Sequence, residues 1–161
     1  MMDNHIVSGL DAFLIFQLGD EKFAVNIGYV RRILGNTVLT RVPHAPDEFL
    51  GVMNLAGEVI PVIDGRLKFG LPKKEAGPDS GIVILLLPGE TGVNAAGLLV
   101  DRVLQVVDIP EECRVPPPET GSRLQHMFIR SVARLKDTFV LILNEERLFG
   151  QGDLVTTATN I

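Results

Sequence analysis

The segment from residue 49 to residue 69, FLGVMNLAGEVIPVIDGRLKF, constrains the fold most strongly, because it joins two strands, a tight turn and a helix start without interruption. Residues 52–55 predict a short strand, Gly57 supplies the reversal, and residues 59–63 form an almost wholly apolar run of strand length. Such a run is typical of a strand buried on both faces. Pro61 removes a donor, so we expect this strand at a sheet edge or without a partner beside that amide.

The same segment ends in a helix-capping pattern. Asp64 stands where an N-cap residue belongs, and residues 65–68 follow as one turn of helix. Phe69 and Gly70 close the turn. We therefore expect a hairpin that leads into a short helix.

Composition limits the class of protein. The 161 residues are 46% hydrophobic, which is enough for one good core or two small fused ones. The longest apolar run, residues 82–87, is far shorter than the ~20 residues of a membrane-spanning helix. A net charge of −5, from 15 basic and 20 acidic residues, provides neither the basic surface of a nucleic-acid binder nor a polybasic membrane patch. We expect a soluble unit with no membrane insertion.

The chain start and the cysteine content favour a reducing compartment. The first residues, MMDNH, lack a basic region followed by an apolar stretch, so no export signal is expected. Cys113 is the lone cysteine and has no disulfide partner within the chain. We therefore expect a cytoplasmic protein, with residues 1–9 and 151–161 as flexible termini.

Elsewhere the hydrophobic pattern predicts further strands and turns. The predicted strands are residues 12–18, 22–25, 38–42, 82–87, 97–107, 127–135 and 139–143. Residues 27–31 predict one helical turn, and residues 145–149 repeat the short helix that follows the first hairpin. The proline-rich residues 71–80 and 115–122 are expected as a connector and an exposed loop.

The second half of the chain repeats the order of elements of the first half. Residues 12–34 align with residues 82–104 at an offset of 70 positions, and residues 49–69 align with residues 129–149 at an offset of 80. Two unrelated hairpins with similar periodicity are the alternative, but the shared order of elements favours duplication.

Each half, residues 12–70 and residues 82–150, offers about five short strands, the number at which a sheet can curl into a small barrel. We predict a mainly β fold of two intertwined five-stranded barrels that pack side by side.

Two segments resemble the CheW-like domains of bacterial chemotaxis. Residues 51–64, GVMNLAGEVIPVID, are similar to the family's G-V-x-N-L-R-G-x-I-x-P-V-x-D segment, and residues 97–107, GLLVDRVLQVV, are similar to its G-x-x-V-D-x-V segment. The resemblance covers about residues 12–149. It implies one CheW-like domain, residues 10–150, built of two SH3-like barrels with short helices, without catalysis and without a cofactor.

The resemblance also implies a function. Because the sequence shows no kinase catalytic domain and no receiver domain, it resembles a stand-alone adaptor of signal transduction. Such an adaptor bridges the cytoplasmic tip of a methyl-accepting chemoreceptor and a CheA-type histidine kinase at membrane-associated arrays.

Two positions depart from the family pattern. Ala56 stands where the family usually has an arginine, and Arg32 stands where a glutamate is expected. If those family residues form an ion pair, this chain has lost both partners, which costs less than leaving one charge alone. The departures keep open a divergent scaffold of a pilus-motility or other chemosensory array, or a structural ring component without receptor contact.

Nine residues are candidates for partner binding. They are Val30, Arg32, Ile33, Asn54, Ala56, Gly57, Arg66, Asp101 and Val103. Six of these would border a groove between the barrels that accepts the apolar stripe of a receptor helix: Val30, Arg32, Ile33, Asn54, Ala56 and Val103. For each apolar residue taken alone, a core position is the simpler interpretation.

A small hydrolase is the rival hypothesis. Asp64 and Asp101 would be its paired acids near Arg66, although each stands at an element boundary, where capping or turn bonding is the ordinary explanation. Arg66 either anchors an acidic partner or caps its own helix.

Other chemistry-bearing residues give no pattern. His5, His44 and His126 are scattered, so no metal site is expected. Cys113 lacks an activating neighbour, and the glycine-rich residues 89–92 lack the lysine of a phosphate loop.

Overall fold

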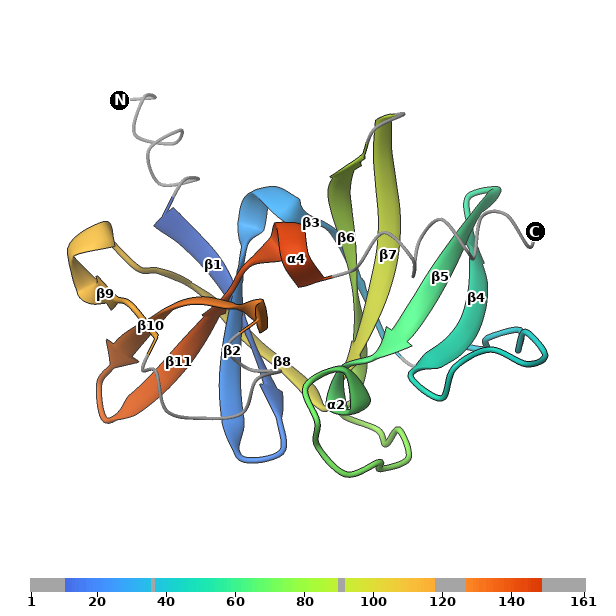
Figure 1. Ribbon diagram of the computed structural model, residues 1–161, viewed down its shortest axis with the longest axis horizontal. Helices are drawn as coiled ribbons and strands as arrows, with labels where there is room; N and C mark the ends of the chain where they lie inside the picture. The colour runs from blue at the N-terminus through green and yellow to red at the C-terminus, as the bar shows by residue number, and fades with distance from the viewer. Residues whose placement is uncertain (1–10, 36, 90–91, 118–126, 149–161) are drawn as a thin grey trace.

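The computed structural model describes residues 11–35, 37–89, 92–117 and 127–148 (Figure 1). The strands are β1 (Ala12–Leu18), β2 (Glu21–Asn26), β3 (Val30–Leu34), β4 (Phe49–Leu55), β5 (Glu58–Asp64), β6 (Gly81–Gly89), β7 (Gly92–Val100), β8 (Arg102–Asp108), β9 (Arg114–Val115), β10 (Ile129–Leu135) and β11 (Thr138–Leu143). Short helical turns join them: η1 (Ile27–Tyr29), α2 (Gly65–Lys68), η2 (Glu111–Cys113) and α4 (Glu145–Leu148).

These strands form two sheets that lie side by side (Figure 1). The six-stranded sheet has the order β8-β1-β2-β11-β10-β9, and the five-stranded sheet has the order β3-β6-β7-β5-β4. The predicted mainly β fold is confirmed. The prediction of five strands holds for one sheet only, because the two-residue strand β9 extends the other sheet to six.

The chain passes between the sheets at two places in the described residues. The first crossing is η1, between β2 and β3, and the second is Asp101, between β7 and β8. Each sheet therefore contains strands from both sequence halves. The prediction of one continuous strand over residues 97–107 is wrong, because Asp101 divides it into strands of different sheets.

The internal repeat is visible in the strand pairing. In both later hairpins the register shifts near the start, between Phe49 and Gly51 and between Ile129 and Ser131. These register shifts lie 80 positions apart, which agrees with the predicted offset. In the other pair of hairpins, Leu18 pairs with Glu21 and Gly89 pairs with Gly92.

Strands β1 and β6 are apolar except for Gln17, because both of their faces are buried. In β1, Phe13 and Ile15 pack into a cluster within the six-stranded sheet. Ile82 and Ile84 of β6 pack into the matching cluster within the five-stranded sheet. The alternate residues of both strands meet in a third cluster, which we call the central cluster; they are Leu14, Phe16, Leu18, Val83, Leu85 and Leu87.

Four phenylalanine rings run through the central cluster. Phe16 stacks on Phe23 with ring centroids 5.7 Å apart, and Phe23 stacks on Phe69 at 4.8 Å. Phe69 meets Phe128 edge-on at 5.8 Å. Because Phe69 follows the five-stranded sheet while Phe16 and Phe23 belong to the six-stranded sheet, these contacts join the two sheets.

One local prediction from periodicity is wrong, and another differs only in where the element ends. Residues 38–42 do not form a strand; Thr40 makes one isolated bridge with Val52, and Val38 is 91% exposed. Pro43 and Pro46 follow directly and prevent a longer ladder. The helical turn predicted over residues 27–31 ends at Tyr29, after which the chain enters β3.

Pro61 lies in an internal strand, not at an edge, since β5 pairs with both β4 and β7. Its amide side is nevertheless free of a partner, as the alternative prediction required. Val52, which faces Pro61, exchanges both backbone bonds with Thr40, so the Pro61 nitrogen points away from β4. The pairing with β7 starts only at Val62.

Several expectations fall outside the described residues. The predicted flexible termini, residues 1–9 and 151–161, are among them, as are most of the exposed loop predicted over residues 115–122 and the last residue of the helix predicted over 145–149.

Gly65 provides a test of the packing between α2 and β7. A Cβ atom there would lie 2.5 Å from the Leu99 carbonyl oxygen. We expect Gly65→Ala to lower the free energy of unfolding by roughly 1–3 kcal/mol, because the backbone must shift to relieve the overlap. Gly77→Ala is the control, since no atom lies within 4 Å of a Cβ there. Chemical denaturation that shows equal losses for both variants would contradict this account.

Candidate functional site

The second crossing between the sheets is fixed by one carboxylate. Asp101 Oδ2 accepts a hydrogen bond of 2.8 Å from the Gly19 backbone N–H in the β1–β2 turn. The Asp101 backbone N–H donates to the Gln17 carbonyl at 3.1 Å. The residue that links the two sheets is therefore bonded to β1 and its turn.

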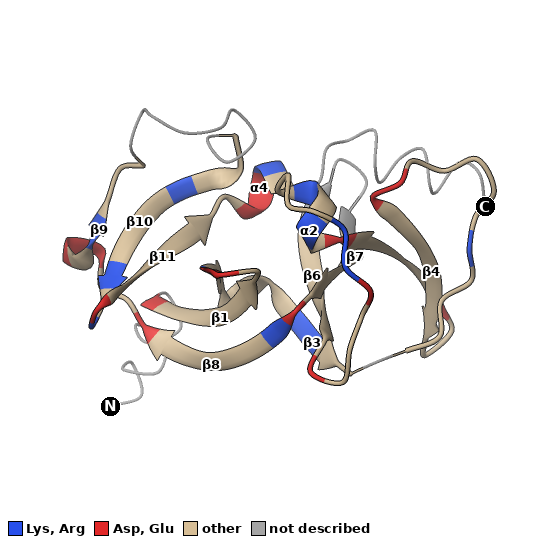
Figure 2. Cartoon of the chain, turned by 90° about the horizontal axis from the view of Figure 1, so that it is seen from below, with Lys and Arg blue, Asp and Glu red and all other residues tan. Residues whose placement is uncertain are grey.

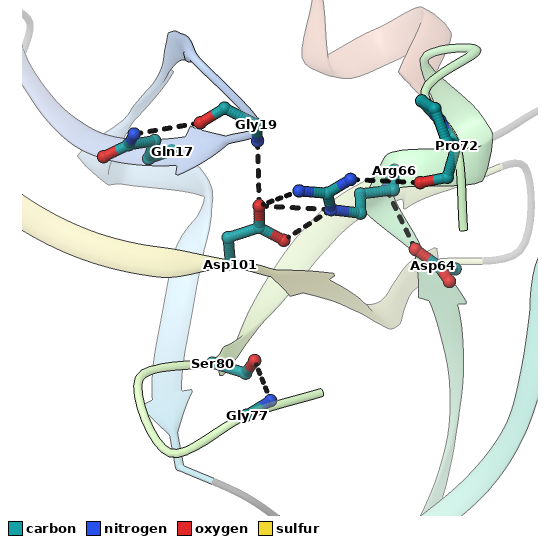
Figure 3. A network of polar contacts seen from close by, with 8 residues as sticks. All are labelled: Gln17, Gly19, Asp64, Arg66, Pro72, Gly77, Ser80 and Asp101. Atoms are coloured by element: carbon teal, nitrogen blue, oxygen red, sulfur yellow. Dashed lines mark hydrogen bonds and ion pairs between the residues drawn. The ribbon is translucent and has the colours of Figure 1, made fainter. Parts of the chain in front are cut away.

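Arg66 holds the same carboxylate from the other sheet (Figure 3). Its Nε lies 2.9 Å from Asp101 Oδ1 and its Nη2 lies 2.7 Å from Oδ2, while Nη1 donates to the Pro72 carbonyl at 3.0 Å. We call Gly19, Arg66 and Asp101 the crossing clasp. Arg66 therefore pairs with a carboxylate of its own chain, and its role in partner binding stays a prediction.

Asp64 has the capping role that the sequence predicts. Its Oδ1 accepts from the Arg66 backbone N–H at 2.9 Å, and this bond starts α2 after β5. The cap therefore orients the helical turn that carries the Arg66 side chain to Asp101.

The two aspartates differ in their electrostatics. The Arg66 guanidinium holds the pKa of Asp101 below its usual range, the Gly19 N–H adds to this effect, and partial burial opposes it. Burial raises the pKa of Asp64, although two backbone N–H groups oppose it. A carboxylate with a lowered pKa is a weak base, so Asp101 is poorly suited to the general-base role of the hydrolase hypothesis.

A pocket of about 520 Å³ lies beside the crossing clasp, between the β1–β2 turn and the connector that precedes β6. Its two arginines are already paired, Arg66 with Asp101 and Arg102 with Asp79 at 3.0 Å. This pairing leaves neither guanidinium free to bind a substrate anion.

The candidate residues Arg32, Asn54, Ala56 and Gly57 lie at a corner where the five-stranded sheet curls. Arg31 of β3 and Glu58 of β5 form an ion pair of 2.8 Å there. Arg32 is exposed and forms no ion pair with a described residue. It lies on the edge strand β3.

The β4–β5 turn has a defined geometry at this corner. The Asn54 side-chain oxygen accepts from the Gly57 N–H at 2.9 Å. Ala56 and Gly57 are exposed and adopt positive φ angles of 54° and 86°. Lys136 holds the equivalent position in the β10–β11 turn with φ 56°, but Asp137, which follows it, does not share the positive φ of Gly57.

The three apolar candidates divide into two groups. Val30 and Val103 are partly buried and pack against the central cluster, as core residues do. Ile33 is 44% exposed. The structure thus brings Val30 and Val103 to the joint between the sheets and leaves Ile33 open to solvent on an edge strand.

Charged side chains avoid several strands (Figure 2). β1, β4 and β11 carry no charged residue at all. Among the described residues, no group of three or more His, Cys, Asp or Glu side chains could hold a metal ion. His5 and His126 lie outside this part of the chain, and Cys113 is exposed.

Glu145 is a buried residue that the sequence-based reasoning missed. Its side chain is 3% exposed, accepts from the Asn26 backbone N–H at 2.8 Å, and lies 3.8 Å from Arg130. Burial raises its pKa, while the Asn26 N–H acts in the opposite direction. Glu145 thus binds the start of the first crossing, as Asp101 binds the second. An acidic residue at the start of the predicted helix, two positions after a strand, was the available signal.

A family model, the CheW-like domain, matches residues 12–152. The chain belongs to the CheW-like family. It is 36% identical to the probable chemotaxis protein CheW of Rhizobium etli over 138 residues, 86% of each chain. It is 33% identical to the chemotaxis protein CheW of Rhizobium meliloti over 145 residues, which cover 90% of this chain and 91% of that one.

The crystal structure of the scaffolding protein TtCheW from Thermoanaerobacter tengcongensis is similar, with a TM-score of 0.79 and 30% sequence identity. The match covers 89% of this chain and 96% of that chain. The family resemblance read from residues 51–64 and 97–107 is therefore confirmed. In the described part of this CheW-like protein, no helix is long and apolar enough to span a membrane.

The crossing clasp predicts a pH-dependent stability difference. We expect Asp101→Asn to lower the free energy of unfolding at pH 7 by about 1–3 kcal/mol, because the Arg66 guanidinium loses its ionised partner. A carboxylate with a lowered folded-state pKa stabilises above its unfolded pKa of about 3.9 and loses this effect as the pH falls through the folded value. The difference between wild type and variant should therefore shrink below pH 4.

Asp79→Asn is the matched control for this measurement. Asp79 and Arg102 form an ion pair in which both side chains are more than half exposed. Such a pair contributes little. Denaturant titrations from pH 7 to pH 3 that show the same loss for both variants would remove the special role of Asp101.

Proposed function

We propose that this CheW-like protein is a non-enzymatic adaptor that couples the cytoplasmic tip of a methyl-accepting chemoreceptor to a CheA-type histidine kinase. The observation that carries the proposal is the match of the CheW-like domain over residues 12–152. Relatives that span most of the chain are chemotaxis proteins, and the similar solved structure is described as a scaffolding protein.

The mechanism rests on shape and rigidity. An adaptor holds two partners at a fixed separation, so it needs one stiff body with two surfaces and no reactive group. The central cluster supports this, because a large apolar contact between two layers resists relative motion. The crossing clasp and Glu145 add bonds at the two points where the chain passes between the layers.

The receptor helix would contact the joint between the sheets. Val30 and Val103 lie there, and Ile33 adds an exposed apolar side chain beside them on β3. A helix with an apolar stripe suits such a surface, because anchors three or four residues apart share one face. The kinase's own CheW-like domain would meet the strand ends of either sheet.

The corner of Arg32 and Ala56 favours a second candidate, a divergent scaffold for a pilus-motility or other chemosensory array. Arg32 is an exposed cation with no described ion-pair partner, and Ala56 offers only a methyl group. A partner surface that fits Arg32 and Ala56 would differ from one that fits the glutamate and the arginine expected at these two positions in the family. Pull-down with the co-encoded kinase and receptor separates the two candidates.

Ala56→Asp tests the receptor surface. The positive φ of Ala56 suits aspartate at least as well as alanine, so stability should stay nearly unchanged. If the receptor helix covers this turn, binding must desolvate the new carboxylate, and we expect affinity to fall by about tenfold or more. Co-sedimentation with receptor-containing membranes and kinase measures the effect.

Lys136→Asp is the matched control, because Lys136 holds the same turn position in the β10–β11 hairpin and has a similar φ angle of 56°. It should leave receptor co-sedimentation unchanged. Equal receptor binding by Ala56→Asp and wild type would exclude the β4–β5 turn from the interface.

A further inference from the structure

A second pocket, of about 320 Å³, lies in the loop that precedes β4. We call it the loop pocket. Its lining includes Arg41, Pro43, His44, Pro46, Phe49 and Lys73. Nothing in the proposed adaptor mechanism uses these side chains.

Backbone bonds hold the loop pocket in one shape. Thr40 and Val52 exchange two hydrogen bonds of 2.9 Å, and the Phe49 N–H donates to the Pro46 carbonyl at 3.0 Å. The Asp64 N–H donates to the Glu48 carbonyl at 2.7 Å and ties the end of the loop to β5. A loop fixed by these bonds and by its prolines binds a ligand with little further loss of entropy.

His44 occupies an unusual backbone conformation on this loop. Its φ of 64° follows Pro43, a pattern in which glycine or asparagine is the favoured residue. A histidine in this region costs backbone energy, and such residues cluster at ligand clamps. Ala56 and Lys136 have similar φ angles, but they lie in two-residue hairpin turns.

The charges of the loop pocket are unbalanced. Neither Arg41 nor Lys73 forms an ion pair with a residue that the structure describes, and Asp47 is the one carboxylate among the lining residues. Most other arginines of known position are neutralised, for example Arg31 by Glu58 and Arg114 by Asp11. On a chain of net charge −5, this local positive excess attracts anions.

We propose that the loop pocket binds a short acidic peptide segment of a partner protein, in which an apolar side chain is flanked by carboxylates. Phe49 and Leu50 supply apolar contact for the side chain, while Arg41 and Lys73 pair with the carboxylates. The volume lies at the lower end of the range for ligand sites, about 300–1,000 Å³, and suits a few residues of peptide.

A peptide titration tests the proposal. The probe is the blocked hexapeptide acetyl-Glu-Glu-Leu-Phe-Glu-Glu-amide, added to the full chain and followed by amide chemical shifts. We expect shifts confined to residues 40–50 and 73, with affinity that falls as salt rises. Arg41→Glu should weaken binding by about tenfold or more, since a favourable charge becomes a repulsive one.

Arg134→Glu is the matched control, because Arg134 is an exposed arginine on β10 of the other sheet. It makes the same change of charge and should leave the affinity unchanged. The peptide with two serines in place of Leu-Phe should bind more weakly, which tests the apolar contact with Phe49 and Leu50. Thermal unfolding of each variant separates lost binding from lost folding.

A charge swap completes the test. The Arg41→Glu, Lys73→Glu double variant should bind acetyl-Lys-Lys-Leu-Phe-Lys-Lys-amide more tightly than the wild type does. Shifts elsewhere on the surface, no binding at millimolar peptide, or equal affinity of Arg41→Glu and wild type would each overturn the proposal.

Discussion

Apolar contact between the two sheets is the interaction on which the rest of the structure depends. One face of β1 packs on other residues of the six-stranded sheet, and one face of β6 packs on other residues of the five-stranded sheet. The opposite faces of both strands pack together in the central cluster. Neither sheet can therefore be removed without exposing a whole strand face of its partner, at a cost of about 25 cal/mol for each Å² of apolar surface. The two layers behave as one body for this reason, and a rigid body is what an adaptor of this family requires.

Carboxylates mark both places where the chain passes from one sheet to the other. Asp101 is held by a guanidinium and a backbone amide, while Glu145 is nearly fully buried and receives the Asn26 amide. The first is stabilised as an anion and the second is penalised by burial, so their pKa values move in opposite directions. Both act on the geometry of the joint, which links the acid–base properties of the protein to its shape without any catalytic step.

Local patterns predicted much of the fold, and long-range pairing explains what they missed. The β4–β5 hairpin and the Asp64 cap follow from residues close in sequence. Asp101 and Arg102 interrupt the apolar residues of 97–107, but they do not show that the flanking strands join different sheets. At the candidate site, the pairing of Arg66 with Asp101 depends on tertiary contact alone, as does the ion pair between Arg31 on β3 and Glu58 on β5.

The five-stranded sheet comes from one continuous stretch, β3 to β7, whereas the six-stranded sheet joins the first hairpin to strands from the end of the described chain. During synthesis, β2 must wait for its parallel neighbour β11, which emerges from the ribosome far later. The five-stranded sheet can be complete while the apolar β1–β2 hairpin still lacks its partners in the six-stranded sheet. Non-local pairing of this kind forms slowly. The nascent chain therefore exposes the apolar strands β1 and β2 through most of translation. Chaperones that shield apolar surface would act during this interval.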